Sequence, residues 1–164
     1  MPGGILPVAR YDDDTIVFLF GREAYDGNWS DFGGSKEGNE SSFQTAVREG
    51  VEELNGFIGT ETEIRTAVKQ NKLPSIEHNG YTTFLVEMNY DPKLPYYFAN
   101  NNSFIKKHLP HLIDQRNGLF EKSEIDWFSI ADLKRSRNTF RRFYRGMVDK
   151  ILSQSKNISK KVDY

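Results

Sequence analysis

Residues 34–56, GSKEGNESSFQTAVREGVEELNG, form a polar loop followed by a helical pattern, and this stretch decides the fold. Ser41 and Gln44 have the spacing of a capping box, in which the serine oxygen accepts a backbone N–H and the glutamine side chain bonds back. Apolar residues then recur at helical spacing, which predicts a helix with one side facing a core. Asn55 and Gly56 predict its end, because both tolerate the left-handed conformation common at helix C-termini.

Three glutamates project from one side of this predicted helix. Glu49, Glu52 and Glu53 are spaced i, i+3 and i+4, so their like charges repel by about 0.2–0.5 kcal/mol per pair. A hard divalent cation would remove that repulsion, since Mg²⁺ prefers carboxylate oxygens. Taken alone, the pattern fits a solvated acidic surface, partly neutralised by Arg48, better than a metal site. The preceding Gly33-Gly34 favours the metal site, because glycine lets the backbone approach an ion or a phosphate closely.

Together these residues resemble the Nudix family. Its motif reads Gly, five residues, Glu, seven residues, then Arg-Glu-aliphatic-any-Glu-Glu-any-Gly-aliphatic. The charged positions and the leading glycine occur here at both spacings, as Gly34, Glu40, Arg48, Glu49, Glu52 and Glu53. Departures occur at Gly50, which replaces an aliphatic residue, at Asn55-Gly56, which shifts the last glycine by one, and at Phe32, which replaces a frequent proline.

The resemblance implies an α+β fold, the Nudix α/β/α sandwich with a mixed β-sheet and a strand-loop-helix catalytic motif. It also implies a MutT-like pyrophosphohydrolase that uses Mg²⁺ or Mn²⁺. A looser similarity, to Nudix proteins of large DNA viruses, lies in residues 29–34 and 121–124.

The resemblance also implies roles for individual residues. The expected metal ligands are Glu49, Glu52, Glu53 and the backbone carbonyl of Gly33. Arg48 and Glu40 would form a supporting pair that orients these ligands. The candidate catalytic residues are Glu52, Glu53, Arg48 and Glu40, together with Glu121 or Glu124.

A carboxylate is expected to activate the attacking water. Glu52 or Glu53 could be this base, and some relatives take it from a later loop. Glu121 aligns best with the late acid that reaches the metal in MutT, with Glu124 as the alternative; both also fit acids on the surface beside a strand. The candidate substrate contacts are Gly34, Phe32 and Arg22.

Other patterns predict the remaining elements. Strands are expected at Ile5–Arg10, Thr15–Gly21, Leu73–Glu77, Tyr81–Tyr90 and Ile125–Ser129, with a turn at Asn79-Gly80. Helices are expected at Thr60–Lys69, near Phe104–Leu109 and from Thr139 to about Leu152. Residues 1–152 are therefore predicted to form a single domain, followed by a polar, flexible tail at 153–164.

Composition excludes several classes of protein. The chain has 164 residues, a net charge of −1 and no cysteine, which excludes disulfides, thiolate zinc sites and cysteine nucleophiles. No secretory signal and no apolar run of about 20 residues occurs, so we expect a cytoplasmic protein with no membrane partner.

A basic stretch near the C-terminus raises the question of RNA. It consists of Arg135, Arg137, Arg141, Arg142, Arg145 and Lys150. Such a cluster could bind an RNA backbone, but long charged side chains also coat exposed helix faces, and we favour this second interpretation.

Three functions remain open. The leading hypothesis is hydrolysis of the pyrophosphate bond in a nucleoside diphosphate linked to another moiety X, with a nucleotide-type small molecule as the substrate. The alternatives are an mRNA-decapping Nudix enzyme that acts on capped RNA, and a non-catalytic Nudix-fold module that binds nucleotide or RNA.

Overall fold

The computed structural model describes residues 1–113 and 119–163. Its strands are β1 (Gly3–Asp12), β2 (Thr15–Glu23), β3 (Trp29–Ser30), β4 (Phe32–Gly34), β5 (Ser75–His78), β6 (Tyr81–Glu87) and β7 (Lys122–Ser129). Five of them run in the order β3-β2-β1-β6-β5, while β4 pairs with β1 and β7 pairs with β2. The sheet is mixed, because β1 is parallel to β6 and antiparallel to β2 and β4.

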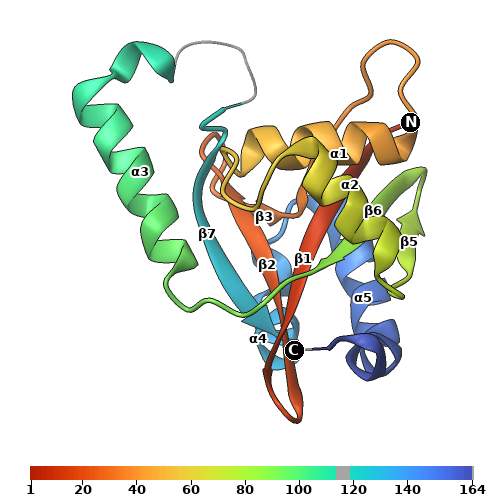
Figure 1. The fold of residues 1–164 in the computed structure, drawn as a ribbon. Helices are drawn as coiled ribbons and strands as arrows, with labels where there is room; N and C mark the ends of the chain where they lie inside the picture. Colours follow the sequence, from red (N-terminus) through yellow and green to blue (C-terminus); the bar gives the residue numbers. More distant parts are fainter. Residues whose placement is uncertain (114–118, 164) are drawn as a thin grey trace.

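Helices cover both faces of the sheet, as Figure 1 shows. The α-helices are α1 (Ser42–Glu53), α2 (Glu61–Gln70), α3 (Leu94–His108), α4 (Ile130–Ser136) and α5 (Arg142–Lys161). Residues of α1, α2 and α3 share one buried cluster with the sheet, and residues of α4 and α5 share the other. The predicted α/β/α sandwich is therefore confirmed.

Alternation along the central strands produces these two cores. Ile5 of β1 packs in the cluster below α1, whereas its neighbour Leu6 packs in the cluster below α5. On β2, Leu19 faces α1 while Phe18 and Phe20 face α5. Successive side chains of a strand point to opposite faces, so a strand buried on both faces is apolar throughout.

The contact between α1 and β1 explains the first departure from the family motif. Gly50 is buried, and a Cβ added there would collide with the side chain of Ile5. The sequence suggested only that Gly50 removes an apolar side chain and weakens the helix. In the structure, Gly50 lets α1 lie close against β1.

The boundaries of α1, α2 and the β5–β6 hairpin follow the predictions closely. Ser41 and Gln44 form the expected capping box of α1, and Thr60 and Glu63 form that of α2. Asn55-Gly56 and Asn79-Gly80 all have positive φ angles, as the predicted helix end and the predicted turn require.

Two regions differ from the predictions. The tail predicted at 153–164 is wrong, because α5 continues to Lys161 and buries Ile158, and Val162 just beyond it is buried as well. Residues 153–161 are mostly polar, and Ile158 alone among them is fully buried, which is too little apolar pattern to indicate a helix.

The short helix predicted near Phe104 is also wrong in extent. The helix α3 starts at Leu94, ten residues before Phe104. A proline in its first turn is compatible with a helix start. Its buried Asn102 donates to the carbonyls of Lys122 and Ser123 and so binds α3 to β7. In the described part of the chain, no helix is both long and apolar enough to cross a membrane.

Candidate active site

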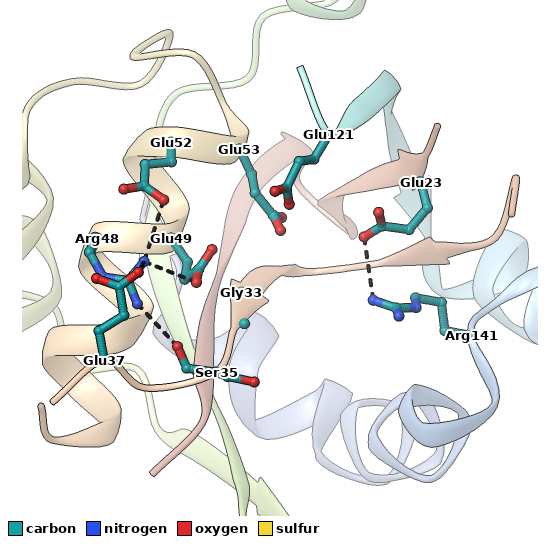
Figure 2. A pocket seen from close by; sticks show the side chains of 11 residues that line it. Glu23, Gly33, Ser35, Glu37, Arg48, Glu49, Glu52, Glu53, Glu121 and Arg141 are labelled. Carbon is teal, nitrogen blue, oxygen red and sulfur yellow. Dashed lines mark hydrogen bonds and ion pairs between the residues drawn. The ribbon is translucent and has the colours of Figure 1, made fainter. Parts of the chain in front are cut away.

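A cavity of about 490 Å³ lies beside the C-terminal half of α1, where the ends of β2 and β4 and the start of β7 meet. Its lining residues are Glu23, Gly33, Gly34, Ser35, Glu37, Arg48, Glu49, Glu52, Glu53, Glu121 and Arg141. Six are glutamates and two are arginines, so the cavity is strongly charged and has a net negative lining. Figure 2 shows these side chains on two walls, with α1 on one side and Glu23 and Arg141 on the other.

Arg48 organises the wall formed by α1. Its Nε and Nη2 atoms donate to the two carboxylate oxygens of Glu40 at 2.8 and 3.1 Å, and Nη2 also donates to the carbonyl of Ser35 at 3.1 Å. Its Nη1 atom contacts Glu49 at 3.0 Å and Glu52 at 3.4 Å. One guanidinium therefore fixes the loop before the helix and two of the carboxylates on the helix.

Glu40 is the anionic partner of this arginine. Hydrogen bonds from Arg48, and then from the backbone at Glu37, lower the pKa of Glu40 to about 2. Its second oxygen also accepts from the hydroxyl of Thr45 at 2.9 Å. The Arg48–Glu40 pair is therefore fully ionised at neutral pH and rigidly held.

Three carboxylates that line the cavity have pKa values shifted in the opposite direction. Burial raises the pKa values of Glu49, Glu52 and Glu121, and neighbouring carboxylates raise them further, while Arg48 lowers those of Glu49 and Glu52. Crowded, partly desolvated acids of this kind favour either a proton or a nearby cation.

Glu53 is the most deeply buried of these acids. Its Oε2 atom is buried and accepts no hydrogen bond within the described residues, although the Nζ atom of Lys122 lies 3.4 Å away. Burial raises the pKa of Glu53 well above its ordinary value, and Lys122 opposes that rise. This buried oxygen has an ion-pair partner but accepts no hydrogen bond within the described residues, and it is a candidate metal ligand.

The glycine loop lies close in front of these acids. A Cβ added at Gly34 would come within 2.5 Å of Oε1 of Glu49, and one added at Gly33 would collide with the hydroxyl of Tyr81. That hydroxyl donates to the buried carboxylate of Asp31 at 2.7 Å, and burial raises the pKa of Asp31 to about 6. Only glycine leaves the space between β4 and the Glu49 carboxylate open.

The donor set fits a hard divalent cation in its chemistry. It offers carboxylate oxygens from one helix, including Oε2 of Glu53, and a close backbone approach at the glycines, and oxygen donors are the ligands that Mg²⁺ and Mn²⁺ prefer. Among residues 1–113 and 119–163, however, no three acidic or histidine side chains already converge closely enough to hold an ion. Instead, Glu49 pairs with Arg48 and Glu53 pairs with Lys122. Metal binding therefore requires the glutamate side chains to turn toward a common point.

Solved structures with similar folds give an independent comparison. An Ap4A hydrolase from C. elegans matches with a TM-score of 0.56, covering 96% of this chain and 99% of that one at 14% identity. The Nudix hydrolase RenU from M. smegmatis matches with a TM-score of 0.55, covering 96% and 87% at 13% identity. The chain has the Nudix fold.

The same fold is found in a bifunctional NMN adenylyltransferase/ADP-ribose pyrophosphatase from Francisella tularensis, solved with AMP and a manganese ion. That match has a TM-score of 0.52 and 16% identity, and it covers 93% of this chain but only 41% of the other. No protein-family model and no curated protein matches the sequence. At these identities the likeness establishes the Nudix fold, and chemistry has to be argued from this chain's own residues.

Most residues expected from the Nudix motif lie together in the structure. Glu49, Glu52, Glu53, Gly33 and Gly34 all line the cavity. Arg48 lines it as well and contacts Glu40 from behind, as the predicted supporting pair. Of the two late acids, Glu121 lines the cavity, whereas Glu124 lies elsewhere and pairs with Arg22 at 2.9 Å.

Two predicted substrate contacts lie outside the cavity. Phe32 is fully buried below α1, so it cannot stack on a base, and its prediction is wrong. It follows the buried Asp31 and belongs to the core strand β4, which the glycine-rich sequence had suggested was a loop. The prediction of Arg22 as a substrate contact is also wrong, because Arg22 lies outside the cavity lining, donates to the carbonyl of Gly27 and pairs with Glu124.

Sequence reasoning missed three charged residues on the second wall. Glu23 and Arg141 line the cavity, and Lys122 lies buried behind them. Glu23 immediately follows Arg22 on β2, and neighbouring residues of a strand face opposite ways, so strand alternation could have suggested Glu23 once Arg22 was excluded. Arg141 was noted only as part of the basic stretch, and no local pattern distinguishes it there.

Proposed function

We propose that the protein is a Nudix hydrolase, a divalent-metal-dependent pyrophosphohydrolase that cleaves nucleoside diphosphates linked to another moiety. One observation carries this proposal: the deeply buried Glu53 lies in a cavity lined by five further glutamates together with Gly33 and Gly34. A pure binding module would have no need for so many crowded carboxylates, since they repel a phosphate unless a cation lies between.

The proposed roles combine the Nudix resemblance with the contacts of Arg48. Glu49, Glu52 and Glu53 would hold Mg²⁺ or Mn²⁺ with the carbonyl of Gly33, while the Arg48–Glu40 pair keeps α1 and the loop in register. When bound, the metal supplies charge neutralisation for the phosphate oxygens.

A water oxygen would attack one phosphorus of the bridge, and the bond from that phosphorus to the bridging oxygen would break. The bridging oxygen leaves with the second phosphate, and the proton of the water passes to a carboxylate. Glu52, Glu53 and Glu121 are the candidate bases, and burial raises the pKa of each toward the range in which a base works at neutral pH.

Arg141 is the proposed contact for substrate charge. Its side chain is 38% exposed, and its guanidinium lies over the ring of Phe143, 5.0 Å from the ring centre. It faces the acids of α1 across the cavity, so it can bind phosphate oxygens on the side of the substrate away from α1 (Figure 2).

Decapping receives less support. In the basic stretch, Arg137 pairs with Asp149 at 2.7 Å, Arg135 pairs with Asp132, and Lys150 donates to the carbonyl of Glu77. These groups are dispersed and paired within the chain, which is typical of a solvated helix surface. A free nucleotide therefore fits the cavity's charge pattern better than a capped RNA.

The test is Mg²⁺-dependent phosphate release from a panel that contains Ap4A, ADP-ribose, nucleoside di- and triphosphates and capped RNA. Ap4A and ADP-ribose belong in the panel because two proteins with this fold are described as acting on them. We expect turnover of at least one nucleotide by the wild type and its loss in Glu52→Gln. Absence of turnover on every substrate, with the wild type equal to Glu52→Gln, would instead support the binding module.

A further inference from the structure

The buried lysine behind the cavity has no part in the proposed reaction. The side chain of Lys122 is 0% exposed, and its Nζ lies 2.7 Å from Oε1 of Glu23, 2.9 Å from Oγ of Ser30 and 3.4 Å from Oε2 of Glu53. Two carboxylate oxygens and a hydroxyl oxygen therefore surround Nζ, and these are the partners expected of an ammonium ion.

The fold makes room for this ammonium at a cost. A Cβ added at Gly21 would come within 2.8 Å of Cδ of Lys122, so a glycine is needed beside its stem. The ring of Phe32 lies 5.8 Å from Nζ and closes another side. Burying a charge is unfavourable, and a buried pair that loses one partner leaves the other charge uncompensated. Favourable interactions with neighbouring groups must therefore offset the desolvation of this ammonium.

Those partners resemble the ligands of a metal ion. Two carboxylates, from β2 and α1, and a hydroxyl oxygen from β3 surround one positive charge. These oxygens are the donors that a hard divalent cation prefers. Glu23 is compensated a second time by Arg141, whose Nη1 lies 3.4 Å from the same oxygen.

We propose that the ammonium of Lys122 is a built-in cation that occupies one cation position of the acidic cavity. It withholds Glu23 from exchangeable metal and confines metal binding to the side of Glu53 that faces Glu49 and Glu52. This inference rests on the proposed function for the identity of the exchangeable metal. Lys122 is thus a positioning residue, which acts on the number of ions that the cavity accepts.

Lys122→Met tests this directly, because methionine keeps an unbranched stem and removes the charge. Without the ammonium, Glu23 keeps only its partly exposed partner Arg141 among the cations described here, and a divalent ion can bridge the carboxylates of Glu23 and Glu53. Counted by electron paramagnetic resonance of free Mn²⁺ during titration, bound Mn²⁺ should rise by one ion per chain relative to the wild type. Mn²⁺ should also raise the Tm of the variant more than that of the wild type.

Matched variants separate this effect from general damage. Lys107→Met, at an exposed position on α3, should bind the wild-type number of ions. In Lys122→Met/Glu23→Gln the extra ion should disappear, since one of its two carboxylates is gone. A folded Lys122→Met that binds the wild-type number of Mn²⁺ ions would overturn the proposal.

Glu23→Gln alone decides the case in which Lys122→Met does not fold. The proposal expects this variant to bind the wild-type number of Mn²⁺ ions, whereas loss of an ion would show that Glu23 is a ligand and overturn it. All these readouts count ions rather than turnover, so they stand even if the wild type hydrolyses nothing. Failure of the proposed function and failure of this inference are therefore distinguishable.

Discussion

On one wall of the cavity, α1 presents Glu49 and Glu52 to an arginine that is itself 15% exposed; on the other, Glu23 contacts a lysine that is 0% exposed. Both walls neutralise carboxylates with a cation of the chain, but only the first does so within reach of solvent. Ion pairs that water can reach are weak and can be exchanged, whereas a buried pair that loses one partner leaves an uncompensated charge.

We therefore expect the two walls to have different roles. The carboxylates of α1 are paired with a partly exposed arginine, so we expect this wall to admit the metal and to suit the chemistry. The opposite wall is held by Lys122 and offers one partly exposed cation, Arg141, to a substrate. Substitutions on the two walls should therefore differ in kind as well as in size.

The largest effect is expected for Glu53→Gln. Glu53 is a proposed metal ligand on α1 and also contacts Lys122 of the opposite wall, so its substitution should remove charge stabilisation by the bound metal. We expect kcat to fall by about 10²–10³-fold, the range found when one electrostatic contact to a transition state is removed. Glu124→Gln is the matched control, because Glu124 lies away from the cavity. Equal rates for the two variants in steady-state kinetics would contradict this role of Glu53.

Arg48→Ala removes the cation of the α1 wall without removing a carboxylate. Glu40, Glu49 and Glu52 lose their common partner, so we expect Mn²⁺ affinity and activity to fall by about 10–100-fold, as for residues that orient metal ligands. Titration with Mn²⁺ measures the affinity. Arg65→Ala, which removes an exposed pair with Glu61, should behave as the wild type. Unchanged affinity in Arg48→Ala would assign the arginine to stability alone.

Arg141→Ala addresses the substrate side of the second wall. A charge-assisted hydrogen bond contributes about 1.5–3 kcal/mol, so KM should rise by about 10-fold or more with little change in kcat. The neighbouring Arg142→Ala serves as the control, because Arg142 does not line the cavity. A fall in kcat at constant KM would place Arg141 in the chemical step instead.

Gly50→Ala tests how α1 is seated against the sheet. The added methyl group collides with Ile5, and overpacking of this kind costs about 1–3 kcal/mol, while the better helix propensity of alanine returns about 1 kcal/mol. A net loss of about 1 kcal/mol in urea unfolding is expected. Combined with Ile5→Val, the loss should be smaller than the sum of the two single losses. Additive losses would mean that the two side chains do not interact.

The smallest effect concerns pH. In the folded protein the pKa of Glu40 is lowered to about 2 from an ordinary value of 4.5. Its ionised form therefore stabilises the fold fully above pH 4.5, and this stabilisation is lost as the pH falls toward 2. The difference in free energy of unfolding between wild type and Glu40→Gln should therefore shrink between about pH 5 and about pH 2.5. Urea titrations at both pH values measure it. A difference that grows on acidification would have the wrong sign.

The two walls also differ in how far the sequence predicted them. The α1 wall comes from one continuous stretch, in which helical spacing brings Glu49, Glu52 and Glu53 to one side and capping residues mark the ends. Such local patterns also predicted most strands and α2. Even the unexplained Gly50 has a local position, although its reason, the proximity of Ile5, is tertiary.

The second wall could not be found in this way. Lys122 and Glu23 are 99 residues apart in sequence, and Arg141 and Glu23 are 118 apart, so only the pairing of β2 with β7 and the return of α5 bring them together. Phe32 shows the reverse error, since a local resemblance suggested a substrate contact that the strand buries.

The central claim is that the cavity between the two walls holds a divalent cation on the carboxylates of α1. Anomalous diffraction from crystals grown with Mn²⁺ and a non-hydrolysable nucleoside diphosphate analogue tests it most directly. We expect a manganese peak beside Glu49, Glu52 and Glu53, with Lys122 still between Glu23 and Glu53. A cavity without manganese, or an ion bound only elsewhere on the molecule, would contradict it.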